Sequence, residues 1–357
     1  MPRKGRFASK EEAKKLLRKL ASLTLLLLTI SCGSQGGGTS QTTTEEVHLQ
    51  LFWGGDGDPA CLDLLDADDV YECYLSALRE QREYSNAVSL RLVLNGTEII
   101  SPFTELLQAY DEAGYDFIEL WFPNEIWQLS EEDRAKVYEK LKEAEWFDKI
   151  AVINVVDEPY HPNNGWTIEE LREGINEIKE NFPDKKLKVN FAPNVTLPEY
   201  EIPDENLDYV SMDLYPWWFV DSDEDCQDEI LWKSIINQRI QRLKDKTDKP
   251  IIYVAQGYTG YNCERYCQLT ADNVNWSYEV ANANELYGLA FYFPRKIRKW
   301  ADYVEVGYRE PGNEEPEQEI IRIGSEILAI EQSNKTYYSS NPLRYLKEEL
   351  RKKPKSF

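Results

Sequence analysis

Eight short apolar runs alternate with helical patterns along the chain after residue 46. Each run is rich in Val, Ile, Leu, Phe or Tyr, which is typical of buried β-strands. Strands that alternate with helices pair in parallel, so eight units predict an α/β fold of the closed (β/α)8 TIM-barrel type. The predicted strands are Val47–Trp53, Ala87–Leu94, Asp116–Trp121, Ile150–Val156, Leu187–Phe191, Leu207–Leu214, Ile251–Ala255 and Leu286–Phe293.

The segments between the strands carry amphipathic helical patterns. Thr167 and Glu170 form a capping box at the start of the clearest one. Pro198 and Pro203 interrupt the segment after the fifth strand, so the helix there is expected to be short. Together the patterns predict helices over residues 130–146, 167–182, 228–246 and 317–332.

Alternation of side chains across each strand predicts a polar barrel interior. On the fourth strand this parity places Asn154, Val156 and Glu158 on one face. Buried polar groups cost free energy unless they are paired, so we expect one hydrogen-bonded network beneath a site. A polar plug with a structural role alone is the alternative. The expected inward-facing polar residues are Arg91, Glu119, Asn154, Asn190 and Asp213.

The N-terminus has the pattern of a secretory signal peptide: a basic segment followed by the apolar run Leu20–Ile30. The run is shorter than the roughly 20 residues needed to span a bilayer. The junction Ser31-Cys32-Gly33 resembles a bacterial lipoprotein signal, which implies a lipid on Cys32. We therefore expect export and a lipid anchor, with the protein facing the periplasm or the cell exterior. A secretory signal cleaved nearby is the alternative.

The net charge of −23 repels nucleic acid and anionic membrane surfaces, so neither is an expected partner beyond the lipid anchor. An uncharged ligand such as a glycan is compatible with this surface, and we expect a monomer. The expected divisions are a signal peptide over 1–31, a Gly/Thr-rich tether over 32–46, the barrel over 47–335 and a basic tail over 336–357.

Five cysteines follow Cys32, and an exported protein can oxidise them. They are Cys61, Cys73, Cys226, Cys263 and Cys267. We expect a Cys61–Cys73 disulfide and a bridge from Cys226 to Cys263 or Cys267, because neighbouring loops can meet. The chain has two histidines and no cluster with zinc-ligand spacing, so neither a metal nor a cofactor is expected.

The fourth strand runs directly into Asp157-Glu158-Pro159-Tyr160. TIM barrels place their active sites at the C-terminal ends of their strands. Over most of residues 47–300 the chain resembles the clan of TIM-barrel retaining glycoside hydrolases, whose acid/base Glu ends the fourth strand, often as Asn-Glu-Pro. The resemblance implies cleavage of O-glycosidic bonds in a poly- or oligosaccharide, with Glu158 as general acid. The clan's nucleophile is a Glu ending the seventh strand, where this chain has Gln256.

Glycoside cleavage needs a second carboxyl group, and Gln256 cannot supply it. Asp213, at the end of the sixth strand, is the best candidate. It lies two strands from Glu158, which suits the gap of roughly 6.5–9.5 Å in inverting enzymes. A salt bridge from Asp213 to Arg91 is the structural alternative. Weaker candidates for the second carboxylate are Asp56, Glu119, Glu125 and Asp157.

Aromatic residues crowd the same strand ends, and sugar rings pack their C–H faces on aromatic planes. The expected ligand-contacting residues are Trp53, Arg91, Glu119, Trp121, Asp157, Tyr160, Asn190, Tyr215, Trp217, Trp218, Gln256, Tyr258 and Tyr292. Two other functions stay open. One is a non-catalytic glycan-binding barrel, which Gln256 supports, and the other is a structural surface lipoprotein with a decayed site.

Overall fold

The computed structural model describes residues 49–53, 67–99, 103–115, 117–220, 222–256, 258–262, 265–292, 298–299, 303–307 and 314–340. The chain divides into two compact units, Met1–Thr44 and Glu45–Phe357, and the described residues all belong to the second. The expected signal peptide, Cys32 and the tether lie outside the described residues. Within the described ranges, no helix is both long and apolar enough to cross a membrane.

Parallel strands form a curled, TIM-barrel-like sheet in the order β1-β12-β9-β8-β7-β6-β5-β2. β1 pairs with β12 on one side and with β2 on the other, which closes the ladder. All eight predicted strands are present, and their ends differ from the predicted ones by at most three residues. They are β1 (Leu49–Trp53), β2 (Ala87–Arg91), β5 (Phe117–Trp121), β6 (Ile150–Asp157), β7 (Lys186–Phe191), β8 (Tyr209–Leu214), β9 (Ile251–Gln256) and β12 (Gly288–Tyr292).

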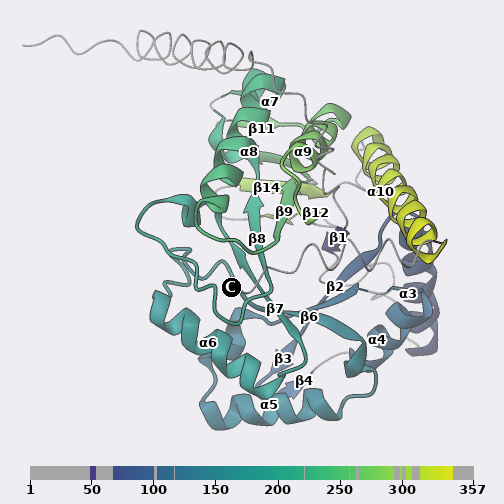
Figure 1. Cartoon of the computed structure of the whole chain (residues 1–357), viewed down its shortest axis with the longest axis vertical. Helices are drawn as coiled ribbons and strands as arrows, with labels where there is room; N and C mark the ends of the chain where they lie inside the picture. Colours follow the sequence, from purple (N-terminus) through teal and green to yellow (C-terminus); the bar gives the residue numbers. More distant parts are fainter. Residues whose placement is uncertain are drawn as a thin grey trace, which may run out of the picture. The chain divides into compact units, whose positions relative to one another are not determined.

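Helices cover the outside of the parallel sheet (Figure 1). They are α3 (Ala67–Arg82), α4 (Phe103–Glu112), α5 (Glu131–Glu143), α6 (Ile168–Asn181), α7 (Asp223–Cys226), α8 (Glu229–Lys244), α9 (Ala271–Ala283) and α10 (Glu314–Ser340). The predicted capping box of Thr167 and Glu170 begins α6. After β7 the described chain forms only the short turn η3 (Pro193–Thr196), which confirms the expected shortening. α10 extends beyond its predicted end at residue 332, into the expected C-terminal tail.

The barrel interior changes from apolar to polar along the strands. Near the N-terminal ends, an inner cluster packs around the axis and includes Val152, Tyr209 and Val254. Two residues further along their strands lie Asn154, Ser211 and Gln256, all buried. A strand shows the same face every second residue, so these polar groups also point to the axis. The polar half of the interior therefore faces the carboxyl ends of the strands.

A small antiparallel sheet, which the sequence patterns did not predict, follows β9 and β12. It consists of β10 (Tyr258–Asn262), β11 (Arg265–Cys267), β13 (Arg298–Lys299) and β14 (Tyr303–Gly307). A separate hairpin joins β3 (Leu94–Asn95) to β4 (Glu98–Ile99). A Cys226–Cys267 disulfide, with 5.8 Å between the Cα atoms, ties α7 to β11. This confirms the predicted bridge from Cys226, whereas Cys61, Cys263 and the side chain of Cys73 lie outside the described part.

Candidate active site

An extra residue in β6 shapes the candidate site. Asn154 pairs with Lys188 on β7, but the next pair is Asp157 with Asn190, so β6 uses three residues where β7 uses two. Such a β-bulge reverses the alternation of side chains and is common next to active sites. The parity prediction for this strand is therefore wrong at Val156, which packs in the outer core layer, and Asp157 takes the inward position.

The turn η1 (Asn124–Gln128) bonds the backbone groups around the bulge. The indole N–H of Trp127 donates to the carbonyl of Val155 at 3.0 Å. Asn124 accepts from the Asp157 N–H at 3.2 Å and donates to the Asp157 carbonyl at 3.2 Å. Because a bulge leaves ladder groups unpaired, these three bonds hold it in one geometry.

Glu158 follows with a left-handed backbone, at a φ of 45°. For a residue other than glycine this conformation costs about 1–3 kcal/mol, so it persists only where the surroundings hold it. The Glu158 N–H donates to the carbonyl of Asn190 at 2.7 Å. Its own carbonyl accepts from the Asn164 side chain and from the His161 N–H, both at 2.9 Å. Strain of this kind is concentrated at functional sites.

Asn190 links the carboxyl groups of neighbouring strands. Its amide nitrogen donates to the Asp157 carboxylate at 2.9 Å, and its amide oxygen accepts from the Ser211 hydroxyl at 2.7 Å. Asp213, at the end of β8, lies near enough to Asn190 and Tyr215 for both side chains to lower its pKa against the effect of burial. Only part of the expected polar network is present, in which Asn190 and Asp213 lie together with Asp157.

The carboxyl groups of Asp157, Glu158 and Asp213 hold their protons more tightly than usual. The pKa of Glu158 rises to about 8, chiefly because of burial and then because of the Asp157 charge. Burial raises the pKa of Asp157 to about 6, against the hydrogen bond from Asn190 and the nearby charges of Lys188 and Arg91. The pKa of Asp213 lies well above its usual range because of burial and then the charges of Glu158 and Asp157.

A buried ion pair lies one layer below the carboxyl groups. Lys188 Nζ is 2.6 Å from Glu119 Oε1, and both side chains are fully buried. The contact is electrostatic rather than a well-aligned hydrogen bond. In the same layer the side chains of Ser89 and Asn154 are buried and have no hydrogen-bond partner among the described residues. Glu119 therefore neutralises Lys188 inside the barrel, which gives it a structural role and not the expected contact with ligand.

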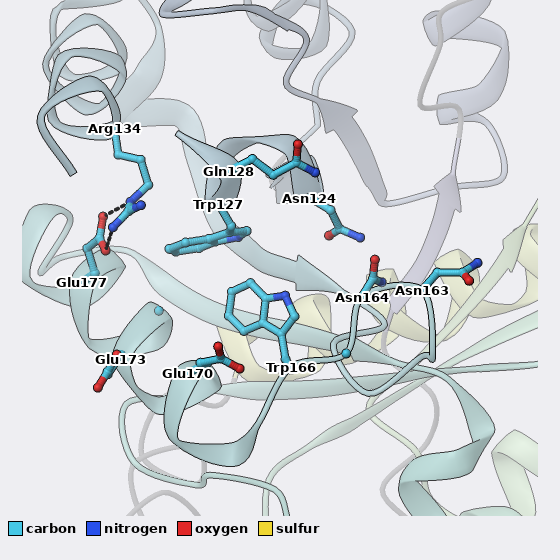
Figure 2. Close-up of a pocket in the computed structure, with 12 residues that line it drawn as sticks. Asn124, Trp127, Gln128, Arg134, Asn163, Asn164, Trp166, Glu170, Glu173 and Glu177 are labelled. Carbon is cyan, nitrogen blue, oxygen red and sulfur yellow. Dashed lines mark hydrogen bonds and ion pairs between the residues drawn. The ribbon is translucent and has the colours of Figure 1, made fainter. Parts of the chain in front are cut away.

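A cavity of about 380 Å³ lies behind the Asp157–Glu158 peptide, between α5, α6 and η1. Figure 2 shows Trp127 and Trp166 meeting edge to face in it, with ring centroids 5.3 Å apart. Arg134 and Glu177 line one side of the cavity, where Arg134 donates two hydrogen bonds to Glu177 and lies over the Trp127 ring. Asn124 and Asn164 line the side of the cavity away from Arg134 (Figure 2), so the cavity borders the residues that hold the bulge.

Other predicted ligand contacts have different surroundings from those expected. Arg91 is exposed at the end of β2, not buried in the barrel. Tyr160 is buried, its hydroxyl donates to the Glu201 carbonyl at 2.6 Å, and its ring stacks on Tyr200. Its role is therefore packing. Trp218 is half-buried against Tyr215, not on an open loop.

The remaining predicted residues fall into two groups, those whose side chains the structure describes and those whose side chains it does not. Gln256 is buried and shares the inward face of Val254, as expected, and Trp121 is half-buried beside the inner cluster. The side chains of Trp53, Trp217, Tyr258 and Tyr292 lie outside the described part. Sequence reasoning missed Asn124 and Asn164. In the sequence each is an Asn shortly after a predicted strand. Asn is common at such positions in ordinary turns, so the pattern does not distinguish a site residue from a turn residue.

Among the described residues, no group of three or more His, Cys, Asp or Glu side chains has the geometry of a metal site. No family model and no curated protein matches the chain.

Solved glycoside hydrolases share a distant structural likeness with the chain. The glycoside hydrolase domain of PgaB (BpsB) from Bordetella bronchiseptica is 12% identical, with a TM-score of 0.45 over 69% of this chain and 93% of that domain. The β-glucuronidase of Ruminococcus gnavus is 12% identical, with a TM-score of 0.47 over 69% of this chain and 43% of the enzyme. The β-glucuronidase of Dictyoglomus thermophilum is 14% identical, with a TM-score of 0.42 over 69% and 43%. At these scores the likeness carries no argument about chemistry.

Proposed function

We propose that this protein cleaves O-glycosidic bonds in a poly- or oligosaccharide, with Glu158 as the general acid. The observation that carries the proposal is the raised pKa of Glu158, about 8, at the carboxyl end of a barrel strand. A general acid must hold its proton near the operating pH, and an ordinary surface Glu does not. Burial and the neighbouring Asp157 charge supply this property here.

Two carboxyl groups beside Glu158 are candidates for the second role in the reaction. Asp213 comes from β8, two strands away from β6, so it approaches the substrate from another side. Asp157 is the more readily ionised of the two, because Asn190 donates to it and two cations lie nearby. Glu158 is the general acid whether Asp157 or Asp213 takes the second role.

Hydrolysis of a panel of poly- and oligosaccharides, followed by release of reducing ends, tests the proposal. The wild type should cleave at least one member, and Glu158→Gln should lose that activity by 100-fold or more, since general acid catalysis contributes about 10²–10⁴. Glu173→Gln is the matched control, because Glu173 is an exposed Glu on α6. Equal activity in the wild type and Glu158→Gln would reject Glu158 as the acid.

A glycan-binding protein without catalysis is the second candidate, and Gln256 at the end of β9 favours it. An amide there holds a sugar hydroxyl but cannot attack an anomeric carbon. In this case the wild type binds a glycan on an array and hydrolyses no member of the panel. The Gln256→Ala variant loses the binding.

We also propose that Cys32 carries a lipid that anchors the exported protein. The support is the basic and apolar pattern before Cys32 and the Gly/Thr-rich segment after it. Radioactive palmitate supplied to a bacterial host should label the wild type and not Cys32→Ala. Equal labelling of both would remove the anchor.

A further inference from the structure

The bulge in β6 places two consecutive carboxyl groups at the barrel mouth. In a regular strand Asp157 and Glu158 would point to opposite faces of the sheet. Here Asp157 faces Asn190 inside the barrel, and the left-handed backbone of Glu158 turns the chain directly after it. Hydrogen bonds from Asn124 and Asn164 hold both carbonyl groups of this dipeptide. The arrangement therefore keeps two acids side by side at a considerable cost in backbone strain.

Two carboxyl groups on adjacent residues can contact two neighbouring substituents of one sugar ring. They are less well placed to flank a single glycosidic bond from opposite sides. If Glu158 protonates the glycosidic oxygen on the anomeric carbon C1, its neighbour lies beside the substituent on C2. The end of β9, where a protein nucleophile is expected, has the amide of Gln256. A nucleophile is therefore required from elsewhere in any reaction that retains configuration.

We propose that the substrate is a glycan of 2-acetamido-2-deoxy sugars, whose acetamido oxygen replaces the protein nucleophile while Asp157 holds the acetamido N–H. This inference rests on the proposed function and deepens it. Substrate assistance of this kind is an established exception to the use of two protein carboxylates in sugar cleavage. The reacting groups are joined within one molecule, so the attack benefits from high effective concentration.

The steps balance in atoms and protons. The acetamido carbonyl oxygen bonds to C1 as the bond from C1 to the leaving oxygen breaks, and Glu158 gives that oxygen its proton. The product on the enzyme is a cyclic oxazolinium ion, whose positive N–H the Asp157 carboxylate binds. Water then attacks C1, Glu158 takes a proton from it, and the ring opens to restore the acetamido group. The sugar leaves with its original configuration.

The contacts of Asp157 offset part of the effect of burial, so that this carboxyl group is ionised above a pH of about 6, its raised pKa. Its oxygen accepts the Asn190 amide N–H at 2.9 Å, and the charges of Lys188 and Arg91 act on it. Asp213 has less favourable surroundings for a charge, because Glu158 and Asp157 both repel it. A neutral Asp213 is suited to bonding a sugar hydroxyl, and the inverting role that the sequence suggested for it is not needed.

Nitrophenyl β-glycosides test the inference, because in the gluco and galacto series the β leaving group lies opposite the acetamido group. The wild type should hydrolyse N-acetylglucosaminide or N-acetylgalactosaminide at least 100-fold faster than the matched glucoside or galactoside. Replacement of the acetamido group by trifluoroacetamido, a poorer nucleophile, should lower kcat by 10-fold or more. Nuclear magnetic resonance of the first product should show retained configuration.

Variants separate this inference from the proposed function. Asp157→Asn should lower kcat on the acetamido substrate by 100-fold or more, whereas Asp213→Asn should act mainly on KM. Inverted product, equal rates with and without the acetamido group, or loss of kcat in Asp213→Asn alone would overturn the inference. In each of those outcomes hydrolysis by Glu158 still stands. Absence of hydrolysis across acetamido and hydroxyl substrates would instead reject the proposed function, and the inference with it.

Discussion

The side chain of Asn124 bonds both polar groups of the Asp157 backbone. Its oxygen accepts from the Asp157 N–H and its nitrogen donates to the Asp157 carbonyl, each at 3.2 Å. Asn124 is not part of the strand that it completes, so the position of the candidate acids depends on a neighbouring loop. We describe Asn124 as a positioning residue, since it reaches Glu158 only through the backbone.

Substitution of Asn124 by Ala should therefore affect both stability and turnover. The loss of two hydrogen bonds should lower the free energy of unfolding by about 1–3 kcal/mol. The hydrolysis rate should fall because the Asp157–Glu158 peptide is released from its register. Urea unfolding and kcat measure the two effects. The control is Asn163→Ala, since Asn163 is an exposed residue of the same cavity that bonds its described neighbours through its backbone N–H. Equal behaviour of the two variants would contradict the positioning role.

The raised pKa values predict a narrow pH range for hydrolysis. Asp157 becomes ionised as the pH rises through about 6, and Glu158 loses its proton as the pH rises through about 8. If the active form has Asp157 charged and Glu158 neutral, kcat/KM should rise through the first value and fall above the second. The two limbs belong to the coupled carboxyl groups as a set. A profile that is flat from pH 5 to 9 would contradict this assignment.

The Lys188–Glu119 pair offers a double-mutant test of the barrel interior. Lys188→Met leaves Glu119 buried without a countercharge, which should cost about 3–5 kcal/mol of stability. The double variant Glu119→Leu/Lys188→Met should recover most of that loss. Lys188 also lowers the pKa of Asp157, so Lys188→Met should move the acidic limb of the pH profile to higher pH. A double variant no more stable than Lys188→Met would show that packing, not the unpaired charge, sets the cost.

Gly174 tests the packing of the cavity behind the site. A glycine inside a helix costs about 1 kcal/mol relative to alanine, so alanine is expected here unless it collides. A Cβ on Gly174 would lie 3.2 Å from Trp166 and 3.3 Å from Trp127. Gly174→Ala should therefore destabilise the protein by up to about 2 kcal/mol and shift its tryptophan fluorescence. Glu173→Ala is the control on the same helix, and a stabilised Gly174→Ala would mean that the rings yield freely.

The strands and four of the eight described helices, α5, α6, α8 and α10, could be predicted from the sequence because their signals are local. An apolar run indicates a buried strand, and a cap such as Thr167 with Glu170 indicates the start of a helix. Both signals span only a few residues. The bulge in β6 could not be predicted this way, since Val155-Val156 reads as two more residues of a regular strand. Its cause is tertiary, in the bonds from Trp127 and Asn124. Parity counted from Asn154 therefore assigned the wrong inward residue.

The surroundings of the candidate site were harder to predict than the acids themselves. Glu158 was identified from its place at a strand end, which the barrel topology makes informative. Tyr160 has the same signal but packs against Tyr200, because a strand-end aromatic serves packing as readily as binding. The antiparallel sheet around β10 and β14 was missed, because none of its four strands is longer than five residues.

The dependence of hydrolysis on the leaving group tests Glu158 as the general acid most directly. Two glycosides of one sugar are compared, one with an alkyl leaving group that needs protonation and one with 2,4-dinitrophenolate, which leaves without it. Glu158→Gln should lose 100-fold or more in kcat/KM on the alkyl glycoside and 10-fold or less on the dinitrophenyl glycoside. Equal losses on both substrates, or no loss on either, would contradict the assignment.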